Sequence, residues 1–159
     1  MTMPLDSESR IQDDDHLALK LWLRMLTCTN MVENSLRRKL RESFQSTLPR
    51  FDLLAQLYRH PEDLTMGELS SLMMVSAGNV TALVGQLEKE GLVKRTPLKT
   101  DRRIYQVKLT ARGRKHFSEM AQAHELWVAE MFKAVGHDGM EELMRDLGKL
   151  KEGLRAAEG

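Results

Sequence analysis

The chain has 159 residues, with 24 Lys and Arg against 23 Asp and Glu, so its length suits about one compact domain and its net charge is only +1. No apolar run approaches the roughly 20 residues of a membrane-spanning helix, and the polar, acidic start lacks a signal-peptide pattern. We therefore expect a cytoplasmic protein without a membrane partner. The single Cys28 excludes an internal disulfide framework.

Residues 1–15 are predicted to form a flexible N-terminal tail, and residues 16–60 a pair of helices. One long helix is expected from His16 to about Ser46, because no Gly or Pro interrupts it and apolar side chains recur at helical spacing. These are Leu17, Leu21, Met25, Cys28, Val32, Leu36, Leu40 and Phe44. A second helix is expected after Pro49, ending at His60-Pro61.

Residues 61–110 carry a helix-turn-helix pattern. Thr65 and Glu68 fit a capping box at the start of one short helix, and Ser76 can cap the next. Gly91 closes this second helix, whose apolar stripe is Val80, Leu83, Val84 and Leu87. Its opposite face has no charge and consists of Ala77, Asn79, Thr81, Ala82 and Gln86. Such a face suits a helix that enters the major groove and contacts base edges.

Two strand-like runs follow, joined by a basic turn. Residues 91–115 contain nine cations and one anion, Asp101, a net charge of +8 in a chain of +1. This concentration of charge directly after a helix-turn-helix pattern predicts binding to DNA phosphates. The alternative is a solvated surface hairpin.

Residues 111–159 are predicted to form two more amphipathic helices, the first capped by Thr110 and broken at Gly136 and Gly139. Apolar stripes this long must be buried somewhere, so the first and the last two helices predict a homodimer. Two copies would present two recognition helices to a pseudo-palindromic operator in double-stranded DNA, with half-sites roughly 34–36 Å apart.

Together these segments resemble the MarR family of bacterial transcription regulators. The resemblance runs from about residue 16 and rests on Leu69-Ser70, Val75-Ser76, Val80-Thr81, Leu83-Val84, 87–89, 91–93, Arg95, the wing motif 101–103, Leu109-Thr110 and Gly113. It implies a mainly α (α+β) fold, in which a winged helix-turn-helix is flanked by N- and C-terminal dimerisation helices. Ala82 departs from the family, which commonly has a basic residue there. The methyl of Ala82 favours contact with a thymine methyl over contact with guanine.

The resemblance to the MarR family, together with the uncharged helix face and the basic turn, implies a set of DNA contacts. The major groove would meet Asn79, Thr81, Ala82 and Gln86, with Ser76 at the phosphate backbone. Arg102 or Arg103 would enter the minor groove, with Arg103 held by Asp101. Sequence-independent phosphate contacts are expected from Lys94, Arg95, Lys99 and Lys108.

A second basic cluster, Arg37, Arg38 and Arg41, lies outside the DNA-binding segment, with Arg50 just beyond it. It is either a solvated face offset by neighbouring glutamates or a site for the phosphates of a nucleotide-like ligand. Residues 31–57 resemble a MarR subgroup that controls hydroxycinnamate degradation and responds to aromatic acyl-coenzyme A. That resemblance implies a repressor without a cofactor, released by an effector such as p-coumaroyl-coenzyme A. The cluster would pair with its phosphates, and the acyl pocket would be lined by Trp22, Met25, Cys28, Phe51 and His124.

Several alternatives remain open. Cys28 could sense peroxide, but no charge adjoins it in sequence, and a small buried core residue is the favoured interpretation. His124 could be a hydrogen-bonded core histidine. The effector could be a free phenolic acid, and the winged helix could bind a protein instead of DNA. An enzyme is disfavoured, because no glycine-rich phosphate loop is present and the histidines have no metal-ligand spacing.

Overall fold

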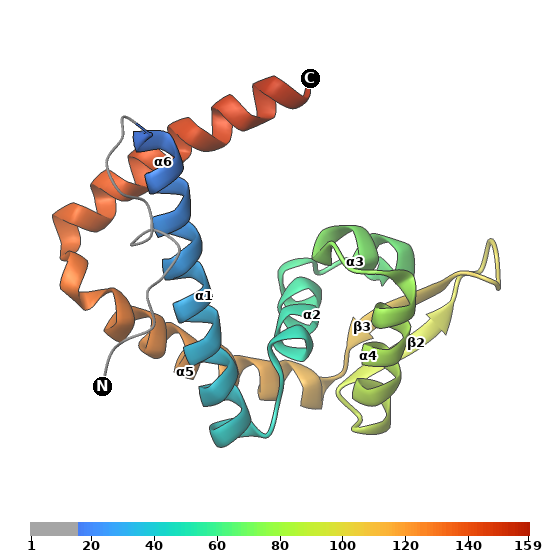
Figure 1. Ribbon diagram of the computed structural model, residues 1–159. Coiled ribbons are helices and arrows are strands. Elements are labelled where there is room, and N and C mark those ends of the chain that lie inside the picture. Colours follow the sequence, from blue (N-terminus) through green and yellow to red (C-terminus); the bar gives the residue numbers. More distant parts are fainter. Residues whose placement is uncertain (1–15) are drawn as a thin grey trace. The chain divides into compact units, whose positions relative to one another are not determined.

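The computed structural model describes residues 16–159 (Figure 1). The elements in chain order are α1 (Leu17–Phe44), α2 (Leu48–Arg59), β1 (Leu64–Thr65), α3 (Met66–Met73), α4 (Ala77–Lys89), β2 (Val93–Pro97), β3 (Tyr105–Leu109), α5 (Ala111–Phe132), a short 3-10 turn (Lys133–Val135) and α6 (His137–Glu158). The mainly α fold with a small sheet agrees with the fold class expected from sequence. The predicted tail, residues 1–15, lies outside the described residues.

The chain divides into two compact units, the second beginning at His124. The segments predicted from sequence, 1–15, 16–60, 61–110 and 111–159, were divided by motif and not by compactness. The first unit includes the beginning of α5, because Phe117 and Met120 are buried. The Phe117 ring lies 5.4 Å from that of Phe51 and 5.0 Å from that of Tyr58, both in α2. This aromatic packing joins the start of α5 to α2, which a division by motif does not show.

The predicted helix caps of the helix-turn-helix are confirmed. The Thr65 backbone N–H donates to Glu68 Oε2 at 2.8 Å, and the Glu68 N–H donates to Thr65 Oγ1 at 3.1 Å. Ser76 Oγ accepts from the Asn79 N–H at 3.2 Å. Each such cap stabilises a helix start by about 1 kcal/mol, so local sequence alone fixes where α3 and α4 begin.

The sheet is antiparallel, with strand order β1-β3-β2. Val93 lies opposite Leu109 and Pro97 opposite Tyr105, which confirms the expected hairpin. Strand β1 was not expected from sequence. It has only two residues, Leu64 and Thr65, paired with β3, and this length is too short to show a strand's alternation.

The core of the first unit lies where α2, α3 and α4 pack against the sheet. Its fully buried side chains include Leu53, Leu54, Leu69, Val80, Val84, Leu87 and Val107. The predicted apolar stripe of α4 is therefore confirmed, with Leu83 half-buried at its edge. The uncharged face of α4 is left pointing outward.

Helix α1 buries only Leu36 and Leu40 within one copy of the chain. Leu17, Leu21 and Trp22 nearer its start are each more than half exposed. Cys28 is also exposed, so the interpretation of this thiol as a buried core residue is wrong for the single chain. The sequence pattern gave an apolar stripe correctly but did not say whether the same chain covers it. In residues 16–159 no helix combines the length and apolar character needed to cross a bilayer.

Asp52 of α2 provides a test of the α1–α2 packing. Its pKa is raised above 3.8, first because the carboxyl is partly desolvated and second because of Glu33 on α1, while Arg59 lowers it. An acid whose folded pKa is raised favours the fold below its unfolded pKa and loses that contribution as pH rises through the folded value. We therefore expect Asp52→Asn to raise Tm at pH 7 by roughly 1–3 °C, a small shift because water screens the carboxyl.

The gain should shrink as pH falls through the folded pKa and disappear below 3.8, where the carboxyl becomes protonated in both states. Thermal melts between pH 3.5 and 7 measure this, with Glu152→Gln, an exposed carboxyl of α6, as the matched control. An equal gain at every pH would mean that the desolvation of Asp52 is not the cause.

Candidate nucleic-acid interface

The outward face of α4 is uncharged and open to solvent. Ala77, Asn79, Thr81, Ala82 and Gln86 are all exposed, as is the N-cap Ser76. The Thr81 hydroxyl donates to the Ala77 carbonyl at 2.9 Å, so its oxygen can still accept a hydrogen bond. Amide, hydroxyl and methyl groups on one helix face are the groups that contact base edges in a major groove.

The hairpin of β2 and β3, yellow in Figure 1, projects from α4 and ends in a wing tip built around Asp101 and Arg103. Arg103 Nε and Nη2 donate to the two Asp101 carboxylate oxygens at 3.1 and 3.2 Å, and the Arg103 backbone N–H donates to Oδ1 at 3.0 Å. These side-chain and backbone hydrogen bonds lower the Asp101 pKa, the side-chain bond most. The predicted ion pair is confirmed. It holds a guanidinium that is 91% exposed in one orientation.

Three of the predicted phosphate contacts, Lys94, Lys99 and Lys108, are exposed cations, as is Arg102, a predicted minor-groove residue. Within residues 16–159 none of them has an ion-pair partner. Lys94 and Lys108 lie directly opposite each other on β2 and β3. Like charges in this position destabilise a hairpin, so an anion bound nearby would relieve the repulsion.

Arg95 differs from the prediction of a free phosphate contact. Its Nη2 lies 3.3 Å from Glu88 Oε1, its backbone N–H donates to Glu88 Oε2 at 3.1 Å, and its guanidinium lies 5.5 Å from the centre of the Tyr105 ring. The charge of Arg95 is therefore already engaged, and the side chain joins α4 to the hairpin. Sequence reasoning missed Glu88, because a contact between a helix and the following strand has no spacing signal of its own.

The predicted effector residues lie on α1, α2 and α5. Arg37 donates to Asn34 Oδ1 at 2.7 Å and lies 4.0 Å from Glu33, as the solvated-face alternative expects. Arg38 and Arg41 are exposed and, among residues 16–159, unpaired. Trp22 and Cys28 are exposed on the first half of α1, with Met25 half-buried between them. Phe51 is a core side chain packed on Phe117, and His124 belongs to the second unit.

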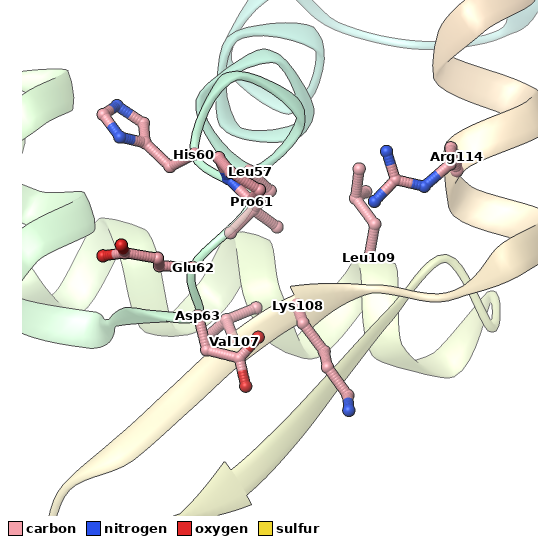
Figure 2. Close-up of a pocket in the computed structure, with 9 residues that line it drawn as sticks. All are labelled: Leu57, His60, Pro61, Glu62, Asp63, Val107, Lys108, Leu109 and Arg114. Carbon is pink, nitrogen blue, oxygen red and sulfur yellow. The ribbon is translucent and has the colours of Figure 1, made fainter.

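Two hollows of the first unit lie elsewhere, and neither is lined by a predicted effector residue. The pocket in Figure 2 has a volume of about 130 Å³ and lies between residues 60–63, β3 and Arg114 of α5. Its ionisable groups point in different directions, so they do not converge on one ligand atom (Figure 2). The second hollow is formed by Tyr58 and the first turns of α5, where Arg114 lies over the Tyr58 ring at 5.5 Å.

Comparison with known proteins decides the family. A solved MarR family transcriptional regulator from Silicibacter pomeroyi is 33% identical to this chain and has a TM-score of 0.74, and the alignment covers 91% of this chain and 99% of that one. The chain belongs to the MarR family. The family model itself, described as MarR family, matches residues 46–105.

Other relatives agree with this assignment. The transcriptional activatory protein BadR from Rhodopseudomonas palustris is 32% identical over 108 residues, which are 67% of this chain but only 61% of BadR. A MarR family regulator from Streptomyces coelicolor, solved in complex with DNA, has a TM-score of 0.76 over 91% of this chain and 92% of that one. At 22% identity, this second likeness shows the fold alone.

MarR family members are transcriptional regulators and not enzymes. The structure offers no metal centre in its described part, since no three His, Cys, Asp or Glu side chains of residues 16–159 gather as ligands. The candidate nucleic-acid interface of this MarR-family chain is the exposed face of α4 together with the wing.

Proposed function

We propose that this MarR-family chain is a homodimeric repressor that binds a pseudo-palindromic operator in double-stranded DNA. The observation that carries the proposal is the uncharged, exposed face of α4 beside a wing whose Arg103 is held by Asp101. The helix supplies groups that distinguish base pairs, and the wing supplies an arginine of the kind that a narrow minor groove attracts. The solved DNA complex of a relative with the same fold supports it.

Exposed apolar stripes support the homodimer. Helix α6 buries no side chain in one copy, and Leu143, Met144, Leu147, Leu150 and Leu154 along it are all exposed. The first half of α1 is similarly uncovered. A second copy of the chain is the partner we propose for these faces, since burial of such stripes is strongly favourable.

The proposal is tested by selection of bound duplexes from a random DNA library with the purified full chain. We expect an inverted repeat with half-site centres about one helical turn apart, and binding that weakens steeply with salt. A selection that yields no sequence preference would instead favour a winged helix that binds protein. Because BadR is named an activatory protein, a reporter gene behind the selected site must also be measured with and without the regulator. Repression is the expected result.

Gln86 provides a prediction about base readout. Its amide lies exposed on α4, and a side-chain amide can bond adenine in a bidentate manner. We expect Gln86→Ala to relax preference at one base pair per half-site and to weaken operator binding by roughly 1–3 kcal/mol. Binding-site selection with the variant measures this, and Gln122→Ala, an exposed glutamine of α5, is the matched control. An unchanged selected sequence would remove Gln86 from direct readout.

For the effector we propose an aromatic acyl-coenzyme A, with p-coumaroyl-coenzyme A as the first candidate. The support is the pair of exposed cations Arg38 and Arg41, which lie on the same side of α1 near its C-terminal end without ion-pair partners in residues 16–159. Guanidinium groups form strong, often bidentate hydrogen bonds with phosphate groups such as those of the coenzyme. The regulated process would then be the breakdown of hydroxycinnamate-type acids.

Isothermal titration of the full chain with the thioester, with p-coumarate and with coenzyme A alone tests the effector. We expect tight binding of the thioester only, and roughly tenfold weaker binding by Arg38→Ala with unchanged operator affinity. Arg155→Ala, near the end of α6, is the matched control for loss of one exposed charge. Tight binding of the free acid would mean that the basic cluster is a solvated surface with no part in effector binding. If none of the three ligands bound, oxidation of the exposed Cys28 would be the next candidate signal.

A further inference from the structure

An ion pair joins the start of α2 to the end of α4 across 40 residues of sequence. The donor is Arg50 Nη2 and the acceptor is Glu90 Oε2. Glu90 is the C-cap residue of α4, directly after the last turn of the helix that carries the DNA-binding face. Arg50 lies in the first turn of α2, where its backbone N–H donates to Thr47 Oγ1 at 3.4 Å.

Both charges stand at the unfavourable end of their own helix. A helix macrodipole favours cations near the C-terminus and anions near the N-terminus. Here the acid Glu90 is at a C-terminus and the base Arg50 is in a first turn. Neither charge therefore stabilises the helix on which it lies. The ion pair between the two helices is the interaction that accounts for both residues.

The two side chains of this ion pair differ in how much of their surface is exposed. The Arg50 side chain is 14% exposed, and its Nε has no hydrogen-bond partner, whereas Glu90 is 46% exposed. Glu90 can regain water if the pair is broken, but Arg50 cannot, so its guanidinium depends on Glu90. The chain reaches α2 directly from the C-terminal cap of α1, where the Gln45 N–H donates to the Arg41 carbonyl and the Ser46 N–H to that of Leu40, two residues before α2 begins at Leu48.

We propose that Arg50 and Glu90 are a positioning pair that fixes the recognition helix α4 against the α1–α2 corner. The pair holds the C-terminal end of α4, one helical turn beyond Gln86 of the exposed face. It thereby sets the angle at which Asn79 and Gln86 meet base edges, and so contributes to sequence selectivity without touching DNA. This inference rests on the proposed DNA-binding function. The pair connects α2, the helix that follows the one bearing Arg38 and Arg41, to the DNA-reading helix by one side-chain bond.

The test compares affinity for the duplex selected by the unsubstituted chain with affinity for a scrambled duplex of equal length. Arg50→Met removes a cation and Glu90→Gln removes an anion, so simple electrostatics would shift DNA binding in opposite directions. A positioning pair predicts the same result for both, a fall of roughly tenfold or more in the ratio of the two affinities. Glu42→Gln, an exposed carboxyl of α1, is the matched control and should leave the ratio unchanged.

The exchanged variant Arg50→Glu/Glu90→Arg restores the pair and places each charge at the favourable end of its helix. We expect it to recover most of the selectivity and to melt at or above the temperature of the unsubstituted chain. If the two affinities fall together and in step with Tm, the pair is only structural and the inference is overturned. An unchanged ratio in both single variants overturns it as well. If the unsubstituted chain selects no sequence, the proposed function itself fails, which is a separate result.

Discussion

Arg103→Ala is expected to weaken operator binding by roughly tenfold or more and to reduce the salt dependence by about one phosphate contact. The physical reason is that Arg103 is 91% exposed at the wing tip, while two hydrogen bonds to Asp101 keep it extended in one orientation. An arginine held in this way loses little conformational entropy when it enters a groove. Fluorescence anisotropy with the selected duplex at several salt concentrations measures both quantities.

Two further variants distinguish the effect of the position of Arg103 on operator affinity from the effect of its charge alone. Lys151→Ala removes one exposed cation from α6 and should leave operator affinity nearly unchanged. Asp101→Asn removes an anion near DNA, so charge alone predicts tighter binding. Loss of the bond that orients Arg103 predicts weaker binding, and weaker binding is our expectation. Unchanged affinity in Arg103→Ala at physiological salt would remove the wing from the proposed interface.

Gly113→Ala is expected to destabilise the fold by about 3 kcal/mol, which lowers Tm by roughly 6–12 °C in a protein of this size. A Cβ at this position would lie 1.8 Å from the Leu92 carbonyl oxygen and 2.8 Å from its carbon. Hydrogen bonds restrict any movement of the backbone that would relieve this clash. The Thr110 N–H bonds the same Leu92 carbonyl at 3.1 Å, and the Thr110 hydroxyl bonds the Gly91 carbonyl at 2.6 Å.

Thermal melts by circular dichroism at one fixed protein concentration measure this loss, since dimerisation makes Tm depend on concentration. Gly85→Ala is the matched control. Its added Cβ meets nothing within 4 Å, and alanine is the better helix former, so this variant should be stabilised by up to about 1 kcal/mol. A melting temperature of Gly113→Ala within about 2 °C of the unsubstituted chain would mean that α5 can move away from Leu92 at little cost.

The sequence by itself determined those features that depend on neighbours within a few residues. The caps at Thr65 and Ser76 each join residues three apart, and the bond of Asp101 to Arg103 joins residues two apart. Helical periodicity likewise gave the buried stripe and the uncharged face of α4. These predictions held because helix starts, amphipathic faces and tight wing turns are set by local geometry.

Only the tertiary structure decided which charged side chains are available and which are already paired. Arg95 is seven residues from Glu88, and Arg50 is forty residues from Glu90, so neither pairing has a local signature. The approach of Gly113 to Leu92 and the exposure of Cys28 likewise depend on how helices pack. The two paired arginines also differ in what their partners do: Glu88 ties Arg95 to α4, whereas Asp101 lies two residues from Arg103 and leaves its side chain 91% exposed.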